Sequence, residues 1–359
     1  METKIEATPL LHYVAASGQS EMITYLLKQG VHIEAKPVTG ETPLHIAVRK
    51  GDYAACVQVL LEAGANIMAR TKDGFTALHI AAYEGRLAAC KLLIERKADL
   101  EARDHWGYTI LHQASMGGHG EVVKLLISSG AKLQAQNNTG STPLHSAIEN
   151  GDYKATVKLL LAAGALSEAT DKYRNTPLHY AAQKNRLACA KLLLSRGANL
   201  EARAQHGLTP LHIAAASNQA ELVTLLLSKG ADLEARNSDQ FTPLHYTISN
   251  GDHKLIVKLL LEAGAFKEVR DTHNETPLHY AARKGYLACA QILVSQGADL
   301  EAKGQDELTP LHYAAAGNQV ELVTFLLSKG AKIEAKDNIE STPLHIAIWK
   351  GDYENVARV

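Results

Sequence analysis

Thr42-Pro43-Leu44-His45-Ile46-Ala47 is the stretch that decides the fold, because Thr-Pro-Leu-His or a close variant returns along the whole chain. The histidine of this stretch recurs at steps of 33 or 34 residues. A fixed period of this length predicts a stack of similar repeats rather than separate globular domains. The eleven positions are His12, His45, His79, His112, His145, His179, His212, His245, His279, His312 and His345.

Each repeat contains the signals that start and stop two helices. Threonine precedes the first helix as its N-cap, and proline takes the first helical position, where no amide hydrogen is needed. Six residues after the histidine stands Gly or Asn, which tolerate the left-handed conformation that closes a helix. A second apolar stretch follows, as in residues 221–227, and ends at Gly230 before an extended loop. The pattern predicts a helix, a turn, a second helix and a finger loop in every repeat.

The period and the Thr-Pro-Leu-His-x-Ala signature resemble the ankyrin repeat family over essentially the whole chain. The resemblance implies an all-α solenoid of helix-turn-helix units with β-hairpin finger loops, with about twenty-one helices. It also implies a single continuous array over residues 1–359. The first repeat is irregular, with one extra leucine before His12, and the last is incomplete at Val359. We therefore expect the chain to be a piece of a longer protein.

A longer period lies on top of the repeat. The 34-residue step returns at every third repeat and gives a superperiod of 100 residues, marked by His45, His145, His245 and His345. The extra residue falls between the two helices, at Gly51-Asp52-Tyr53 and its equivalents. Duplication of a block of three repeats is the simplest origin.

Some positions depart from the glycine pattern. Nine repeats have Gly at the end of the second helix, where positive φ is expected, but Lys97 takes this place in the third repeat. We expect backbone strain at Lys97. Weaker strain is expected at the fingertip residues Arg174, Gln240, Glu307 and Glu340.

Composition and cysteine usage exclude several function classes. The net charge of −1 argues against nucleic acid or a membrane surface as the main partner. No apolar stretch approaches eighteen residues, so we expect no direct membrane insertion. The four cysteines stand at equivalent places in different repeats, beyond the Cα separation of roughly 7 Å that a disulfide allows. Buried, reduced thiols indicate a cytoplasmic location; they are Cys56, Cys90, Cys189 and Cys289.

The histidines invite a metal or catalytic interpretation that their spacing does not support. Neighbouring helices lie roughly 8–10 Å apart, whereas zinc needs nitrogen ligands at roughly 2.1 Å, so adjacent repeat histidines cannot share an ion. We expect them to form hydrogen bonds between neighbouring repeats. No Cys-x-x-Cys, His-Glu-x-x-His, Gly-x-Ser-x-Gly or phosphate-loop pattern occurs. We expect no metal, no cofactor and no enzyme activity.

Two columns of opposite charge follow the second helices. Glu34 and its equivalents stand two residues before Lys36 and its equivalents, which include Arg70, Arg103 and Arg236. We expect a solvated ladder of ion pairs, each contributing about 0–1 kcal/mol. An acidic stripe that binds a partner is the alternative.

The resemblance also implies where a partner binds, on the face made by the finger loops and the ends of the first helices. Two clusters of aromatic, Met and basic residues there are candidate sites, because these side chains are enriched at interface cores. The alternative is that the rings pack on each other between fingers. The first cluster is Phe75, Tyr83, Trp106, Tyr108 and Met116; the second is Tyr180, Lys184, Tyr246, Tyr280, Arg283, Lys284, Tyr313, Trp349 and Lys350.

The leading hypothesis is therefore a monomeric scaffold that binds a protein or peptide in this groove. The second cluster is rich in tyrosine and locally basic, which suits an acidic or phosphorylated segment. One alternative is a mechanical or membrane-skeletal spacer. Another is a targeting or adaptor arm of a longer protein, such as a ligase component or a microbial effector.

Overall fold

The computed structural model describes residues 7–36 and 40–350, and these ranges contain 21 α-helices, two short 3₁₀ helices and no strand. The all-α fold of repeated helix-turn-helix units is confirmed. The first helices of the repeats are α1 Ala7–Ala16, α3 Pro43–Lys50, α5 Ala77–Tyr83, α7 Ile110–Gly117, α9 Pro143–Asn150, α11 Pro177–Gln183, α13 Pro210–Ala216, α15 Pro243–Asn250, α17 Pro277–Lys284, α19 Pro310–Ala316 and α21 Pro343–Trp349.

The second helices pair with them in antiparallel hairpins. They are α2 Ser20–Lys28, α4 Ala54–Glu62, α6 Leu87–Glu95, α8 Gly120–Ser128, α10 Lys154–Ala162, α12 Leu187–Ser195, α14 Ala220–Ser228, α16 Lys254–Glu262, α18 Leu287–Ser295 and α20 Val320–Ser328. The 3₁₀ helices lie in finger loops, at η1 Gln205–Gly207 and η2 Gln305–Glu307.

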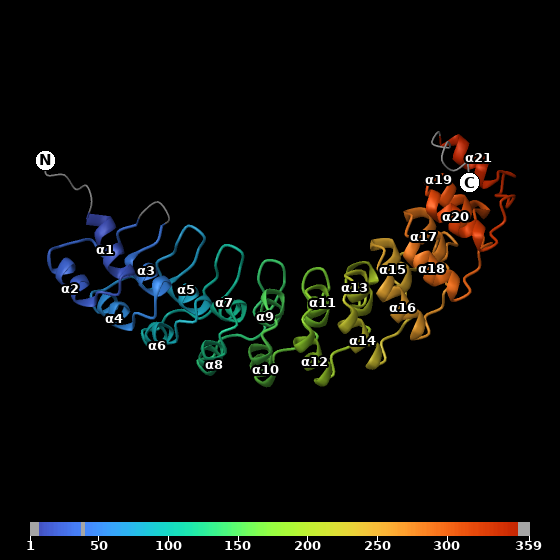
Figure 1. Ribbon diagram of the computed structural model, residues 1–359. Coiled ribbons are helices and arrows are strands. Elements are labelled where there is room, and N and C mark those ends of the chain that lie inside the picture. The colour runs from blue at the N-terminus through green and yellow to red at the C-terminus, as the bar shows by residue number, and fades with distance from the viewer. Residues whose placement is uncertain (1–6, 37–39, 351–359) are drawn as a thin grey trace. The chain divides into compact units, whose positions relative to one another are not determined.

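The helices form two compact halves, Met1–Tyr180 and Ala181–Val359. In the N-terminal half, α1, α3, α5, α7 and α9 pack in succession as one layer, and α2, α4, α6, α8 and α10 as another. In the C-terminal half, α13 to α21 and α12 to α20 form the corresponding two layers. Figure 1 shows the finger loops of the N-terminal half projecting from the ends of its first helices on one side. A single array over residues 1–359 stays a prediction.

The core of each repeat comes from both helices. Leu44 and Ala47 of α3 and Val57 and Leu60 of α4 are 0–1% exposed, and equivalent residues are buried in most other repeats, although Leu344 of the last repeat is 43% exposed. All four cysteines are buried, and none of them forms a disulfide. The core therefore needs a neighbouring repeat on each side, because one hairpin of helices cannot enclose these side chains alone.

The repeat histidines connect each repeat to the next. His45 Nδ1 accepts the backbone N–H of Thr42 at 3.1 Å and lies 2.8 Å from Thr42 Oγ1. Since Nδ1 accepts a hydrogen bond, the proton is on Nε2, which donates to Phe75 O in the following finger loop at 3.1 Å. His112 repeats the arrangement with Ser141 O at 3.0 Å. The expected hydrogen bonds between neighbouring repeats are confirmed.

The turn between the two helices has two forms, and one differs from our expectation. Gly18, Gly85, Gly118 and Gly285 have φ of 70° to 74°, as predicted. In the 34-residue repeats, however, Gly51, Gly151 and Gly251 are extended. The equivalent Gly351 lies outside the described residues. Glycine is needed there for space, because a Cβ on Gly51 would lie 2.6 Å from the Tyr53 ring. The left-handed interpretation of these three glycines was wrong.

The extra residue of the 34-residue repeats adds a contact between repeats. Asp52 Oδ1 accepts the backbone N–H of Ala89 at 3.1 Å, in the first turn of α6 in the next repeat. Asp252 does the same for Cys289 in the first turn of α18, at 3.0 Å. The carboxylate therefore satisfies one of the free amides at the start of its neighbour's second helix.

The finger loops are tight turns held by a buried side chain. Asp104 Oδ1 accepts the backbone N–H groups of Trp106 and Tyr108, both at 2.9 Å. Asp271 does the same in its own loop, for His273 and Glu275. The sequence carries a signal for this, since Asp or Asn stands eight residues before six of the repeat histidines. The predicted hairpins are therefore closed mainly by turn hydrogen bonds of this kind.

The predicted ladder of ion pairs between the Glu and Arg columns was wrong. Glu34 Oε1 instead accepts the backbone N–H of Asn66 in the next repeat, at 2.7 Å. Arg236 Nη1 donates to Arg270 O, also in the next repeat, at 2.9 Å. Both columns are thus used for side chain–backbone bonds that tie successive repeats together. Equivalent bonds are made by Glu101, Glu201, Glu234, Glu268 and Glu301 and by Arg70, Arg103, Arg203 and Arg270.

Positive φ is found at every predicted strained position. Lys97 has φ of 63°, and Arg174, Gln240, Glu307 and Glu340 have φ of 59° to 67°. At the equivalent Gly64, an added Cβ would meet no atom within 4 Å. The disadvantage of Lys97 is therefore the backbone dihedral itself and not a steric clash.

Lys97→Gly should stabilise the protein by roughly 1 kcal/mol, the usual preference for glycine at such dihedrals. Thermal and urea unfolding measure the change. Gly64→Lys is the matched control and should lose a similar amount. An unchanged or lower melting temperature for Lys97→Gly would contradict the assignment of strain.

Acid should destabilise the protein at pH values well above the pKa of its carboxylates, because the buried repeat histidines titrate first. Burial lowers the pKa of seven repeat histidines from 6.5 to about 4, namely His45, His79, His112, His145, His212, His245 and His279. Between these values the unfolded chain binds more protons than the folded one. Stability is therefore complete above pH 6.5 and falls as the pH drops, by up to roughly 1.4 kcal/mol per pH unit for each histidine.

Urea unfolding at pH 7, 6 and 5 measures this dependence. The midpoint should fall at each step. A midpoint that stays constant over this range would show that the buried imidazoles do not titrate as assigned.

Candidate functional site

In each half of the protein, two positions of the repeat line cavities on the side of the finger loops and first helices, which we call the groove. These positions lie four residues before and four residues after the repeat histidine. We call them positions −4 and +4. The residue at −4 lies in the finger loop, and its carbonyl accepts the hydrogen bond from the preceding repeat's histidine, as Tyr108 O does from His79 at 3.3 Å. The residue at +4 lies in the last turn of the first helix, as Tyr83 does in α5. The histidine column therefore fixes the backbone of the groove residues and leaves their side chains variable.

The first predicted cluster surrounds one cavity of the N-terminal half. Its volume is about 300 Å³, and all five predicted residues line it: Phe75, Tyr83, Trp106, Tyr108 and Met116. Phe75 and Tyr108 are −4 residues and Tyr83 and Met116 are +4 residues of the third and fourth repeats. The two repeats thus contribute their matched positions to the same space.

Trp106 lies at the tip of its finger loop, at the mouth of this cavity. Its side chain is 51% exposed, and its ring centroid lies 6.0 Å from that of Phe75. The backbone is held by Asp104 and by Asn138 N, which donates to Trp106 O at 2.9 Å. The loop is therefore fixed while half of the indole stays in solvent. The rings do contact each other, as the alternative interpretation expected, but they leave a cavity between them.

The floor of this cavity is polar but internally satisfied. Gln113 Nε2 donates to Asp104 Oδ2 at 3.0 Å, and both side chains are buried. Burial raises the pKa of Asp104, although its hydrogen bonds oppose the shift. His79, also in the lining, stays neutral at physiological pH, since burial lowers its pKa to about 4. The cavity thus offers mainly aromatic and thioether surface.

Part of the second cluster lines a separate cavity of about 560 Å³ in the C-terminal half. Arg283, Tyr313, Trp349 and Lys350 contribute to it, together with Leu308, His312, Ala316, Gly317 and Ile346. Arg283 and Trp349 are +4 residues of the ninth and eleventh repeats, and the residue between them at +4 is Ala316. The small side chain of Ala316 leaves the space open.

Other members of the second cluster lie elsewhere. Tyr280 is only 7% exposed, and its hydroxyl donates to Asp271 Oδ2 at 2.6 Å. Tyr180 makes the same bond to Asp171 Oδ2 at 2.9 Å. These tyrosines brace the finger loops. Tyr246 packs edge-on against His212, with ring centroids 6.0 Å apart. Lys184 and Lys284 are exposed and do not line the cavity.

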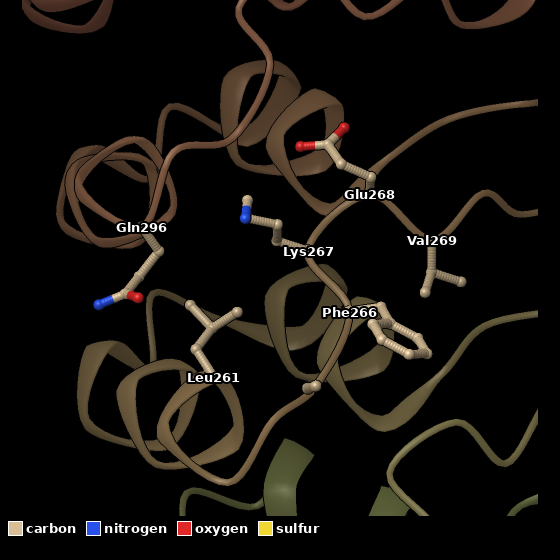
Figure 2. Close-up of a pocket in the computed structure, with 7 residues that line it drawn as sticks. Leu261, Phe266, Lys267, Glu268, Val269 and Gln296 are labelled. Atoms are coloured by element: carbon tan, nitrogen blue, oxygen red, sulfur yellow. The ribbon is translucent and has the colours of Figure 1, made fainter.

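Sequence reasoning missed a third cavity, of about 460 Å³, near the base of a finger loop in the C-terminal half. Figure 2 shows the Phe266 ring and the Lys267 side chain on opposite sides of the chain. Phe266 is 66% exposed. The lining is completed by Leu261, Ala265, Glu268, Val269 and Gln296. The signal available was Phe266 itself, which stands where most other repeats have Asp, Asn or Lys.

Neither a metal centre nor a membrane span is found among the residues that the structure describes. No group of three or more His, Cys, Asp or Glu residues could hold a metal ion. No described helix is long and apolar enough to cross a membrane.

Comparison with protein families gives one result that covers nearly all of the chain. A model described as "Ankyrin repeats (3 copies)" matches residues 11–104, 51–137, 97–171, 154–237, 211–304 and 301–359. A search of curated proteins found no match. Ankyrin repeats are generally protein–protein interaction modules built on a non-catalytic fold. The matched ranges, the period and the helix pairs agree, and the chain belongs to the ankyrin repeat family.

Proposed function

We propose that this protein is a scaffold that binds a segment of a partner protein in its groove, with an apolar side chain of the partner anchored between Phe75, Tyr83, Trp106, Tyr108 and Met116. One observation supports this most: the five residues line a single cavity of about 300 Å³. A volume of this order lies at the lower end of the range of ligand pockets and accommodates one large side chain. The groove therefore offers one anchoring point for a peptide.

The chemistry of the cavity favours a protein partner. Aromatic residues and Met dominate interface cores and carry most of the binding energy where they form desolvated pockets. Trp106 and Phe75 are held on finger loops whose backbones are already fixed by hydrogen bonds. A preorganised wall loses little conformational entropy on binding. A spacer would have no use for such a cavity, so the binding role is the better proposal.

The cysteines support a reducing compartment, which we propose is the cytoplasm. Cys90 is 0% exposed, and burial raises the pKa of its thiol to about 12. Such a thiol is unreactive at neutral pH. We further propose that the protein acts as a monomer, as an adaptor between partners or as an arm of a longer protein.

Trp106→Ala should weaken partner binding about thirtyfold, because loss of a central aromatic anchor typically costs 2 kcal/mol or more. The affinity is measured with peptides selected against the unmodified protein from a random library. Tyr108→Ala is the companion substitution. Thermal unfolding of Trp106→Ala should change by about 0.5 kcal/mol or less, as expected at an exposed fingertip.

Tyr173→Ala is the matched control. Tyr173 occupies the same place in its finger loop, six residues before the repeat histidine, and is similarly exposed at 53%, but it does not line the cavity. Its loss should leave peptide binding unchanged. Early melting of Trp106→Ala would mean that the indole is a packing residue. Equal weakening by Tyr173→Ala would place the anchor elsewhere.

A further inference from the structure

A second groove site in the C-terminal half has a different chemistry from the aromatic cavity. Its cavity of about 560 Å³ is bounded by Arg283 of α17 and by Trp349 of α21. Ala316 stands between them on α19. It takes the +4 position, at which the third and fourth repeats have the large side chains of Tyr83 and Met116. The small residue makes this cavity a slot with a cation at one side and an indole at the other.

Arg283 is held in place by an ion pair and by two aromatic rings. Its Nη2 pairs with Glu275 Oε1, and the Glu275 side chain is only 1% exposed. The guanidinium carbon lies 4.4 Å from the ring centroid of Tyr313 and 5.2 Å from that of Tyr280. The hydroxyl of Tyr313 also donates to Glu275 Oε1. Buried acid and flanking rings thus fix the orientation of a guanidinium whose side chain remains 39% exposed.

The fixed guanidinium keeps donors for a ligand. A guanidinium has five N–H groups, and the ion pair with Glu275 uses Nη2. Burial is the largest single effect and lowers the pKa of Arg283, but Glu275, Tyr313 and Tyr280 together outweigh it, so the pKa is raised and the group stays cationic. Arginine donors in a rigid plane match the two oxygens of a carboxylate.

The other charged residue that lines the slot is also a cation, and the buried carboxylate of Glu275 is not part of the lining. Lys350 lines the cavity, and no carboxylate is among the described residues that line it. His312 adds no charge at neutral pH, because burial lowers its pKa. The N-terminal cavity differs, since Glu84 and Asp104 belong to its lining together with Arg49, which is itself paired with Glu41. Charge complementarity therefore selects an anionic occupant for the C-terminal slot only.

We propose that this slot binds an acidic segment of a partner protein, with a carboxylate on Arg283 and a neighbouring apolar side chain between Ala316 and Trp349. The indole and the alanine methyl supply the apolar surface, and Arg283 with Lys350 supplies the positive charge. This goes beyond the aromatic anchor of the N-terminal half and does not depend on Trp106. It gives the protein a second contact that discriminates by charge.

Fluorescence anisotropy with a labelled peptide tests the proposal. The probe is Gly-Ser-Glu-Leu-Glu-Leu-Glu-Ser-Gly, and the comparison peptide has Gln in place of every Glu. The acidic peptide should bind, and binding should weaken from about 50 to about 300 mM salt because the charges are partly exposed. The Gln peptide should bind at least about tenfold more weakly.

Two variants of the slot separate charge from shape. Arg283→Gln combined with Glu275→Gln removes the cation without leaving a buried carboxylate unpaired, and it should weaken binding about tenfold. Ala316→Leu fills the slot without changing any charge and should weaken binding by a similar factor. Thermal unfolding checks that both variants fold. Lys258→Gln, on exposed α16 outside the slot, should leave the affinity within about twofold.

Several results would overturn the proposal. Equal binding of the acidic and Gln peptides would remove the role of the carboxylate. If Lys258→Gln loses as much affinity for the acidic peptide as the slot variants do, the peptide is attracted by the general surface charge and not by the slot. If Ala316→Leu keeps full affinity, the peptide binds elsewhere. A phosphoserine version of the probe that binds while the Glu version does not would assign the slot to phosphate. Trp106→Ala should leave this binding unchanged, so failure of the aromatic site is distinguished from failure of this one.

Discussion

A neutral imidazole bonded at both ring nitrogens is the interaction on which the rest of the structure depends. In most of the described repeats Nδ1 accepts a backbone amide at the start of its own helix, and Nε2 donates to a carbonyl of the next finger loop, as His45 does with Thr42 and Phe75. Both bonds require the uncharged form with its proton on Nε2. The same bond that stacks the repeats holds the backbone of the groove residue at position −4. Packing and the geometry of the groove therefore share one constraint, while the side chain at −4 is left free to vary.

That freedom explains why two cavities built on the same backbone differ in chemistry. Positions −4 and +4 of one repeat face each other, so their residues act as a pair. Phe75 with Tyr83 makes an apolar wall. Glu275 with Arg283 makes a braced cation, and Glu41 with Arg49 repeats this pairing at the edge of the aromatic cavity, with Arg49 Nε donating at 2.8 Å. Three successive repeats contribute a +4 residue to each cavity, and the volume of the middle one decides how wide the cavity is. This residue is Tyr83 in the N-terminal cavity and Ala316 in the C-terminal one.

Much of this could be predicted from the sequence, because the period specifies which residues are equivalent. The helices, the histidine bonds, the positive φ of Lys97 and the membership of the first cluster follow from position alone. The Glu and Arg columns were misread because a sequence shows opposite charges but not the backbone groups that compete for them. Tyr280 looked available for the same reason: its partner Asp271 lies in the finger loop nine residues earlier. The open slot beside Arg283 depends on Ala316, a residue type that gives no signal by itself.

The carboxylates of the 34-residue repeats have a consequence for how such a chain can be rearranged. Asp52 caps α6 and Asp252 caps α18, so in each case the start of a helix is completed by the preceding repeat. Moving one of these repeats alone would leave an amide without its acceptor and a carboxylate without its donor. A cut that moves three repeats together keeps every such pair intact, because the donor and acceptor recur with the superperiod. A cut that follows the period of about 100 residues is therefore the one that leaves these helix starts capped, whereas a cut around a single repeat does not.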